Sequence, residues 1–326
     1  MIRPYLQIAR PDHWFKNLFM LPGLAVALLL KPERLAGAWL PFLLGVVAAC
    51  LTASANYAIN EYLDREYDKR HPIKKNRPSA GGLIRRRWVV LEWTLLAAAS
   101  LALAWAIGFF FFVVTVWFLL MGVIYNVKPL RTKDVPYLDV LSESINNPIR
   151  FLLGWATAMP AFAPPPGAPL SFHYFDQILA TQLPPSSVMM SYWFGGAFLM
   201  AVKRYAEFRQ IGDPAVAASY RRSFQHYTPE KLLVSSFFYA LNASFFLAIF
   251  LIKYRIEFLL TFPLFSLLFA WYLHIGFKEN SAAQHPEKLY RERSFMFFVL
   301  LLVLVVFALF VVDVPKLGWL LRKNFY

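Results

Sequence analysis

Long apolar stretches separated by short polar segments dominate the chain from about residue 17 to residue 312. The hydrocarbon core of a bilayer is about 30 Å thick, and a helix needs about 20 mostly apolar residues to cross it. The pattern therefore predicts nine membrane-spanning helices, near residues 17–31, 39–59, 88–107, 109–125, 138–160, 187–206, 231–252, 256–277 and 294–312. We expect an all-α, polytopic membrane protein in which residues 1–326 form a single transmembrane domain.

Composition and charge sharpen this picture. Hydrophobic residues make up 59% of the chain and charged residues 16%, whereas a soluble domain usually has about 45–50% and about 25%. A water-soluble enzyme, a disordered chain and a disulfide scaffold are excluded, the last because there is only one cysteine. The net charge of +14 would be typical of a nucleic-acid-binding protein, but the apolar excess favours a membrane protein that binds no nucleic acid.

The basic residues also predict an orientation. Alternate loops, beginning with the N-terminal segment, hold 25 of the 33 Lys and Arg, whereas the loops on the opposite side hold 7. Positively charged loops stay in the cytoplasm. We therefore expect a multi-pass protein of the cell inner (plasma) membrane, with a cytoplasmic N-terminus and the C-terminus outside. The proline-rich segment 161–186 is then an extracytoplasmic loop, because its prolines are incompatible with a regular helix.

The first cluster of acidic residues lies at the end of the second predicted helix. Asn56, Asn60, Asp64 and Asp68 are spaced four apart and share one helix face, with Glu61 beside them. Carboxylates at this spacing repel one another, and a divalent cation offsets the repulsion. Mg²⁺ takes oxygen ligands and commonly bridges to substrate phosphates.

A basic loop follows this helix directly and carries His71, Lys74 and Arg77. An acidic helix end beside a basic loop is the layout expected of a Mg²⁺–diphosphate site. The alternative is a solvated helix end, in which Asp64 and Asp68 only pair with Lys and Arg.

A second polar cluster begins after the fourth predicted helix, at Tyr125 and Lys128, and continues with Asp139, Glu143 and Arg150. Charges inside a membrane-spanning segment are costly and usually face a cavity or a partner. This pattern predicts a second wall of a cytoplasm-facing cavity. The alternative is a structural Glu143–Arg150 ion pair between helices.

Two shorter elements fit the same cavity. Lys16 and Asn17 stand at the entrance to the first predicted helix, and Lys203-Arg204-Tyr205-Ala206-Glu207 ends the sixth. For each element the alternative is a basic anchor at the membrane surface.

These motifs together resemble the UbiA superfamily of intramembrane prenyltransferases. Asn60-x-x-x-Asp64-x-x-x-Asp68 is similar to that family's first acidic motif, with Glu61 where Asp is usual. Four further segments carry a closer resemblance to the decaprenyl-phosphate phosphoribosyltransferases within the superfamily: Arg10-Pro11-x-x-Trp14-x-Lys16-Asn17, Asp68-x-x-His71-Pro72-x-Lys74-x-x-Arg77-Pro78, the Tyr125–Val140 stretch, and Lys203–Glu207. The resemblance implies a UbiA-like bundle of nine helices.

The resemblance also implies an activity: Mg²⁺-dependent transfer of 5-phosphoribose from 5-phosphoribosyl 1-diphosphate to a polyprenyl phosphate. Its metal ligands would be Asn60, Glu61, Asp64, Asp68 and Asp139, and its catalytic residues Asp64, Asp68, Lys16, Lys74 and Arg77. Its substrate-binding residues would be Lys16, Asn17, Asn60, His71, Lys74, Arg77, Tyr125, Lys128, Asp139, Arg150, Lys203, Arg204 and Glu207.

Two other functions stay open at this point. A UbiA-type enzyme that attaches a polyprenyl group to an aromatic or other small acceptor would use the same Mg²⁺–diphosphate site. A transporter would also have many spans with charges inside them, but the inverted repeats typical of transporters are not evident in the sequence. The length of the lipid acceptor stays open, and so does a homo-oligomeric state.

Overall fold

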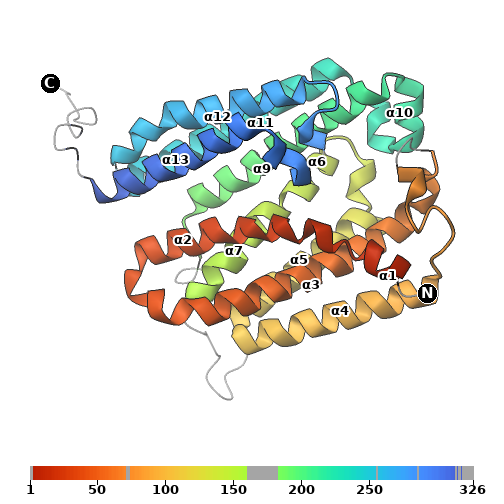
Figure 1. The fold of residues 1–326 in the computed structure, drawn as a ribbon, viewed down its shortest axis with the longest axis horizontal. Helices are drawn as coiled ribbons and strands as arrows, with labels where there is room; N and C mark the ends of the chain where they lie inside the picture. Colours follow the sequence, from red (N-terminus) through yellow and green to blue (C-terminus); the bar gives the residue numbers. More distant parts are fainter. Residues whose placement is uncertain are drawn as a thin grey trace. The chain divides into compact units, whose positions relative to one another are not determined.

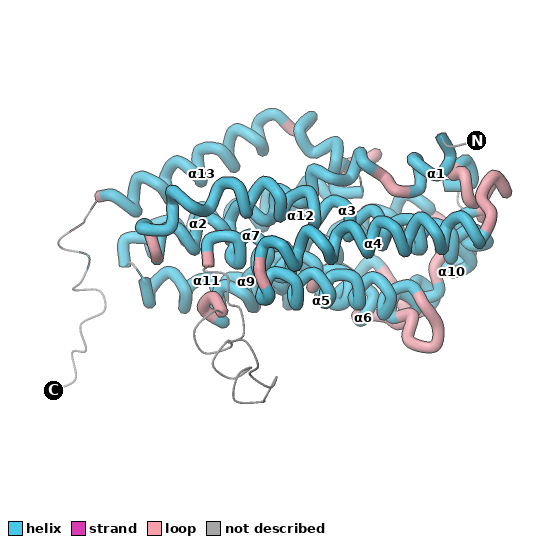
Figure 2. The backbone as a smooth tube through the Cα atoms, turned by 90° about the horizontal axis from the view of Figure 1, so that it is seen from below, coloured by secondary structure: helices cyan, strands magenta, loops and turns pink. Residues whose placement is uncertain are grey.

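The computed structural model describes residues 3–70, 74–159, 183–254, 256–284, 286–312, 314 and 317, and all regular secondary structure in these residues is helical (Figures 1 and 2). Contacts divide the chain into two packing units. The first comprises Met1–Pro184 with Ile211–Tyr227, and the second Pro185–Gln210 with Thr228–Tyr326. Most of the predicted proline-rich loop, residues 160–182, lies outside the described residues.

The first unit holds the N-terminal helices and one short helical insertion. Its helices are α1 (Arg3–Ile8), α2 (Leu21–Leu30), α3 (Leu35–Asp68), α4 (Arg86–Ile107), α5 (Phe109–Asn126), α6 (Leu138–Ser144), α7 (Asn146–Ala158) and α10 (Pro214–Tyr220). Its 3₁₀ helices are η1 (Pro11–Met20), η2 (Pro32–Arg34), η3 (Lys74–Asn76), η4 (Thr132–Asp134) and η5 (Arg222–Gln225).

The described residues of the second unit form four long helices and three 3₁₀ helices. They are α9 (Ser186–Ile211), α11 (Pro229–Tyr254), η6 (Ile256–Thr261), α12 (Phe262–Gly276), η7 (Ala282–Gln284), η8 (Pro286–Arg291) and α13 (Arg293–Val311).

Helix α3 is the central helix of the first unit and packs against α4, α5 and α7. Small buried residues on α3, among them Ala48, Ala55 and Ala58, allow neighbouring helices to approach closely. With 34 residues, the helix is about 51 Å long, well beyond the hydrocarbon thickness of about 30 Å. Its last turns, from Asn60 to Asp68, therefore extend past the apolar part and carry the first acidic cluster.

Helices α2 and α7 cross at two glycines. A Cβ atom on Gly154 would lie 1.9 Å from the backbone oxygen of Met20, and one on Gly23 would lie 1.9 Å from that of Phe151. No side chain larger than hydrogen fits at either position. These glycines bring the entrance segment η1–α2 against α7, and η1 itself also packs on α7.

Six helical segments among the described residues are long and apolar enough to cross a membrane: Arg3–Leu30, Pro32–Asp68, Arg86–Ile107, Phe109–Asn126, Pro229–Tyr254 and Ile256–Gly276. The fifth predicted span is broken into α6 and α7 near Pro148, because proline removes a backbone donor and is tolerated only in the first turn of a helix. The sixth predicted span corresponds to α9, and the ninth to the shorter apolar helix Arg293–Leu309. The count of nine spans stays a prediction.

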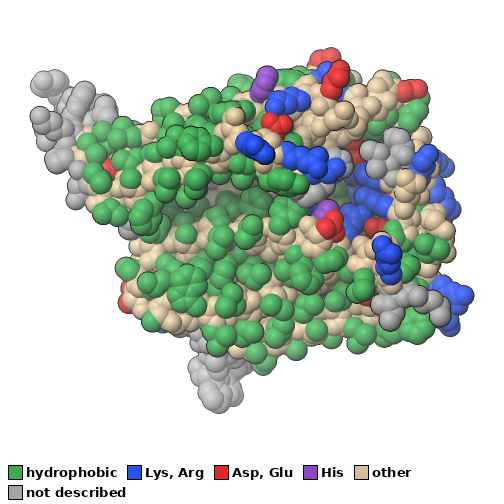
Figure 3. All heavy atoms as spheres, in the orientation of Figure 1, with side chains coloured by type: hydrophobic (Ala, Val, Ile, Leu, Met, Phe, Trp, Pro, Cys, Tyr) green, Lys and Arg blue, Asp and Glu red, His purple; other side chains and the backbone are tan. Residues whose placement is uncertain are grey.

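Large apolar side chains also cover the outward faces of the helices. Leu40 on α3, Leu95 on α4 and Phe297 on α13 are each at least 60% exposed, and Figure 3 shows such side chains along the flanks of the bundles. In the first unit, Lys and Arg gather toward the end where α3 ends and α4 begins (Figure 3). Apolar flanks with a charged end are typical of a helix bundle immersed in lipid.

Candidate active site

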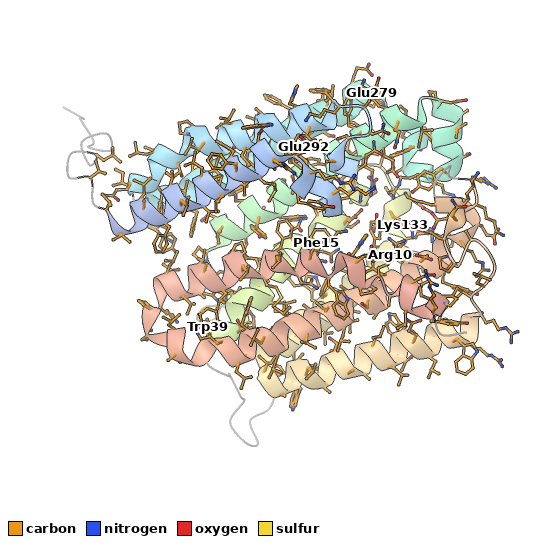
Figure 4. All side chains as sticks on the ribbon, viewed as in Figure 1. Arg10, Phe15, Trp39, Lys133, Glu279 and Glu292 are labelled. Carbon is orange, nitrogen blue, oxygen red and sulfur yellow. The ribbon has the colours of Figure 1, made fainter. Side chains whose placement is uncertain are left out.

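A pocket opens beside the last turns of α3, entirely within the first unit. Three segments form it: the end of α3, the turn that contains η4, and the α10–η5 insertion. Its lining residues are Asp64, Tyr67, Asp68, Arg131, Lys133, Asp134, Tyr220, Arg221 and Arg222. Figure 4 shows the labelled Lys133 in the first unit, toward the end at which α3 finishes.

Asp64 is held by two cations from the η4 turn. Its Oδ1 atom lies 2.8 Å from Arg131 Nη2 and 2.5 Å from Lys133 Nζ. Lys133 also donates hydrogen bonds to Asn60 Oδ1 at 2.9 Å and to Asn126 Oδ1 at 2.7 Å. Burial lowers the pKa of Lys133 to about 8, although the carboxylate of Asp64 opposes this shift.

Asp68 is paired with the basic loop that follows α3. Arg77 donates a hydrogen bond from Nη1 to Asp68 Oδ2 at 2.7 Å. Burial lowers the pKa of Arg77, but Asp68, with smaller contributions from Tyr220 and Glu61, more than offsets this effect, and the pKa lies above its usual value. Lys74, from the same loop, hydrogen-bonds to the Tyr220 hydroxyl, and its ammonium lies 4.4 Å from the Tyr220 ring centroid.

Glu61 is buried, and Arg10 holds one edge of its carboxylate. Arg10 donates from Nε and Nη2 to Glu61 Oε2, at 3.2 and 2.9 Å. The other oxygen, Oε1, is buried without a hydrogen-bond partner in the described part of the chain. Beside this pair, the Lys16 ammonium lies 5.7 Å from the Tyr57 ring centroid.

The second polar cluster is distributed over other contacts. Tyr125 donates a hydrogen bond to Glu143 Oε2 at 2.8 Å. Arg150 donates from Nε to Asn17 Oδ1 at 3.0 Å, deep in the first unit. Asp139 is completely buried and contacts the α10–η5 insertion. None of these side chains is among the described residues that line the pocket.

The other predicted site residues are not among the described residues that line the pocket. Lys128 is exposed on the turn after α5. Lys203, Arg204 and Glu207 belong to α9 in the second unit, where Arg204 Nη1 lies 3.4 Å from Glu207 Oε2. His71 lies outside the described residues.

Sequence reasoning missed several cations that the structure brings to the pocket. Arg131 and Lys133 belong to the Tyr125–Val140 stretch that carried part of the resemblance, but no role was expected of them. Arg221 and Arg222 counted only as basic residues of a cytoplasmic loop. Arg131 and Lys133 could have been found from their place within that stretch. No sequence signal distinguished Arg221 and Arg222 from the other arginines of the loops.

The donor set fits Mg²⁺ that binds together with a phosphorylated substrate. The described residues contain no group of three His, Cys, Asp or Glu side chains that would hold a metal ion alone. Mg²⁺ usually needs only one or two carboxylates when substrate phosphates complete its ligands. Asp64 and Asp68 in the pocket lining supply hard oxygen donors, and the Asn60 amide oxygen accepts a hydrogen bond from Lys133 of the same lining. Glu61, on the same helix, offers a further oxygen, Oε1, that has no hydrogen-bond partner among the described residues.

Comparison with known sequences identifies the family. The model of the UbiA prenyltransferase family matches residues 19–302. The chain belongs to this family. The UbiA assignment makes it an integral membrane protein of the prenyltransferase type, in agreement with the six candidate spans.

Two named relatives are similar in sequence to part of this chain. The decaprenyl-phosphate phosphoribosyltransferase of Mycolicibacterium smegmatis is 28% identical over 242 residues, which cover 71% of this chain and 65% of the relative. The nodulation protein NoeC of Azorhizobium caulinodans is 34% identical over 169 residues, or 52% of each chain. The matched part thus spans less than two thirds of the length of each relative.

Solved structures support the same fold. A UbiA homolog from Archaeoglobus fulgidus, bound to GPP and Mg²⁺, superposes with a TM-score of 0.63. The match covers 95% of this chain and all of the homolog at 20% sequence identity. The UbiA fold expected from the acidic motifs is therefore confirmed.

Proposed function

We propose that this UbiA protein is a Mg²⁺-dependent membrane transferase that moves 5-phosphoribose from 5-phosphoribosyl 1-diphosphate to a polyprenyl phosphate and releases diphosphate. The observation that carries the proposal is the excess of cations over carboxylates in and around the pocket. Arg131, Lys133, Arg221 and Arg222 line it together with Asp64, Asp68 and Asp134, and two further cations, Lys74 and Arg77, contact lining residues.

The charge of the donor accounts for this excess. An allylic diphosphate carries one anionic group, whereas 5-phosphoribosyl 1-diphosphate adds a phosphomonoester with a charge of about −1.5 to −2. The site has more cations than one Mg²⁺–diphosphate unit requires. This excess suits 5-phosphoribosyl 1-diphosphate better than an allylic diphosphate. Arg side chains match phosphate oxygens with two parallel donors, which adds geometric specificity to the charge.

The chemistry needs little more than this electrostatic environment. An oxygen of the acceptor phosphate attacks the anomeric carbon while the bond from that carbon to the diphosphate oxygen breaks. The acceptor phosphate is already ionised, so a strong general base is unnecessary, and the described pocket lining contains no histidine or cysteine. Fixed cations aimed at the leaving group are usually the largest contribution an enzyme makes to such a step.

The residues then have distinct roles. Asn60, Glu61, Asp64 and Asp68 would hold Mg²⁺, which when bound would neutralise negative charge on the diphosphate. Lys74, Arg77, Arg131 and Lys133 bind phosphate oxygens, and the cations that now pair with Asp64 and Asp68 turn toward the donor as it enters. Lys16, at the membrane entrance beside Tyr57, faces the lipid acceptor.

Relatives support both the proposal and its competitor. The relative from Mycolicibacterium smegmatis is named for phosphoribosyl transfer to decaprenyl phosphate. The structural relative from Archaeoglobus fulgidus was solved with GPP and Mg²⁺, which favours prenyl transfer to a small acceptor as the second candidate. We also propose that the pocket lies on the cytoplasmic side of the inner membrane, because the loops that build it are rich in Lys and Arg and such loops usually stay in the cytoplasm.

A donor-competition assay separates the two candidates. Membranes containing the protein are incubated with Mg²⁺ and polyprenyl phosphate plus phosphoribosyl diphosphate labelled in the ribose, or with a labelled allylic diphosphate plus an aromatic acid. The proposal predicts that ribose label enters the organic phase only when polyprenyl phosphate and Mg²⁺ are both present. Labelling of the aromatic acid without any transfer of ribose label would establish the second candidate instead.

A further inference from the structure

A strongly basic segment follows the acidic end of α3, and the candidate active site uses only part of it. Residues 69–91 contain eight Lys and Arg and no Asp or Glu. Lys74 and Arg77 contact residues that line the pocket. The largest remaining group is the run Arg85–Arg87 where α4 begins, which we call the arginine collar. All three arginines are exposed and absent from the described pocket lining, and Figure 3 shows Lys and Arg gathered at this end of the first unit.

Buried residues on both sides fix the backbone of the arginine collar. Ile84 and Val89 pack with Ile8 of α1 in a hydrophobic cluster that α3 completes. The Arg85 backbone N–H also donates a hydrogen bond to the Tyr5 hydroxyl at 3.2 Å. The arginines therefore project outward from a fixed frame. A ligand that binds them has to order only their side chains, which lowers the entropy cost of binding.

The arginine collar has no counter-charge of its own. The first turn of α4 contains no acidic residue, and in the described part of the chain none of the three guanidinium groups forms a salt bridge. Glu92 is the only carboxylate on α4, and it lies about 9 Å further along the helix from Arg86. Like charges on consecutive residues repel one another. An anionic ligand at this point would relieve that repulsion.

The residues that follow on α4 indicate that this ligand is a lipid. Trp88, Leu91 and Leu95 lie on one helix face, and each is at least 44% exposed. Since α4 is one of the candidate membrane spans, this face lies against acyl chains. Trp is typical of the membrane–water interface, and the Arg87 guanidinium lies 5.4 Å from the Trp88 ring centroid. The arginine collar is thus at the depth of the lipid phosphates, beside an apolar face.

We propose that the arginine collar is a binding site for the headgroup of an anionic phospholipid, separate from the candidate active site. Clusters of Lys and Arg next to a membrane-spanning helix attract anionic lipids, and guanidinium groups bind phosphate oxygens through two parallel donors. The lipid phosphate pairs with the arginines, and the acyl chains lie along the apolar face of α4. The inference goes beyond the proposed function and does not depend on it.

Native mass spectrometry of the full-length protein in detergent tests the site. The protein is titrated with dioleoyl phosphatidylglycerol, and dioleoyl phosphatidylcholine, which has the same chains and a zwitterionic headgroup, is the control ligand. The wild type should bind phosphatidylglycerol about tenfold more tightly than phosphatidylcholine. Arg86→Gln/Arg87→Gln should weaken phosphatidylglycerol binding about tenfold and leave phosphatidylcholine binding unchanged. Equal affinity of the wild type for the two lipids, or wild-type affinity in the variant, would overturn the proposal.

A second pair of arginines controls for general attraction by the positive chain. Arg291 and Arg293 are exposed in the second unit, where η8 ends and α13 begins. Arg291→Gln/Arg293→Gln removes the same number of charges and should bind phosphatidylglycerol within about twofold of the wild type, because these arginines are not part of the site. An equal loss in both double variants would show that net charge attracts the lipid, and would overturn a site at α4.

Melting curves in detergent show whether the variants fold. Glutamine favours a helix about as much as arginine does, so Arg86→Gln/Arg87→Gln should melt with the wild type when no lipid is added. It should lose the rise in melting temperature that phosphatidylglycerol gives the wild type. If the double variant does not fold, Arg86→Gln alone should still weaken phosphatidylglycerol binding a few-fold, and an unchanged affinity would overturn the proposal.

A soluble phosphate separates a lipid site from a site for a free anion. Glycerol 3-phosphate carries a phosphate and a glycerol group without acyl chains, so it cannot use the apolar face of α4. It should not displace bound phosphatidylglycerol at equal concentration. Displacement from the wild type but not from Arg86→Gln/Arg87→Gln would mean that the arginine collar receives a soluble phosphate, and would overturn the lipid assignment.

Discussion

At the scale of single residues, cations compensate the carboxylates of Glu61, Asp64 and Asp68 in the last turns of α3. Arg10 pairs with Glu61, Arg131 and Lys133 pair with Asp64, and Arg77 pairs with Asp68. A buried carboxylate without such a partner would cost several kcal/mol. The cations therefore stabilise this helix end, which we propose binds Mg²⁺, before metal and substrate arrive. In the proposed function, Arg77, Arg131 and Lys133 also bind the phosphates of the incoming donor.

Glu61 gives the sharpest prediction at this scale, because one of its oxygens is held by Arg10 and the other has no hydrogen-bond partner among the described residues. If Oε1 is a metal ligand, Glu61→Gln should raise the Mg²⁺ concentration for half-maximal activity about tenfold or more. Mg²⁺ titrations of turnover measure this. Glu66→Gln is the matched control, since Glu66 is exposed on the same helix and, among the described residues, pairs with Arg65 and Lys69.

A different result would contradict a metal-ligand role for Glu61. An unchanged Mg²⁺ requirement in Glu61→Gln, accompanied by a lower melting temperature, would mean that Glu61 only pairs with Arg10.

At the scale of elements, the crossing of α2 and α7 depends on glycine. Gly154→Ala should lower the free energy of unfolding by about 3 kcal/mol, at the upper end for overpacking, because the new methyl group meets the Met20 backbone and no side chain can move aside. Thermal unfolding in detergent measures this. Gly37→Ala on α3 is the control, since nothing lies within 4 Å of the Cβ position at Gly37. Because alanine favours a helix more than glycine does, this variant should raise the free energy of unfolding by about 0.5–1 kcal/mol. Equal melting temperatures for the two variants would refute the close crossing.

Elements with a strong local pattern were predictable from the sequence. The hairpin predicted at 88–107 and 109–125 appears as α4 and α5, Arg86–Ile107 and Phe109–Asn126. The break between α6 and α7 was missed, because the apolar pattern continues through it and only Pro148 marks it.

The candidate site was predictable only in its local part. Of the four polar residues predicted to share one face of α3, Asp64 and Asp68 line the pocket. Asn60 lies beside it and accepts a hydrogen bond from Lys133 of the lining. The fourth, Asn56, packs against Gly122 of α5 and donates a hydrogen bond to the Phe118 carbonyl. Partners such as Arg131 on Asp64 are 67 residues apart in the sequence. Helical spacing shows which residues share a face, but such contacts depend on how the helices pack.

At the scale of the whole molecule, the orientation in the membrane is open to direct measurement. The chain has one cysteine, Cys50, which is buried, so single introduced cysteines can be mapped against a low background. Lys75→Cys, in the basic loop, should react with an impermeant maleimide only after the cells are opened, because that loop is expected in the cytoplasm. Lys31→Cys, between α2 and α3, should react in intact cells. The reverse pattern would contradict the predicted orientation.

The central claim is that the pocket at the end of α3 performs the transfer, and the Asp64→Asn variant tests it most directly. Wild type and variant are compared for the movement of ribose label from phosphoribosyl diphosphate into polyprenyl phosphate, with size-exclusion profiles and melting curves recorded beside the assay. Asp64→Asn removes an expected metal ligand and the charge between Arg131 and Lys133. We predict a loss of turnover of at least about 100-fold in protein that still elutes as a folded species. Turnover close to that of the wild type would contradict the account.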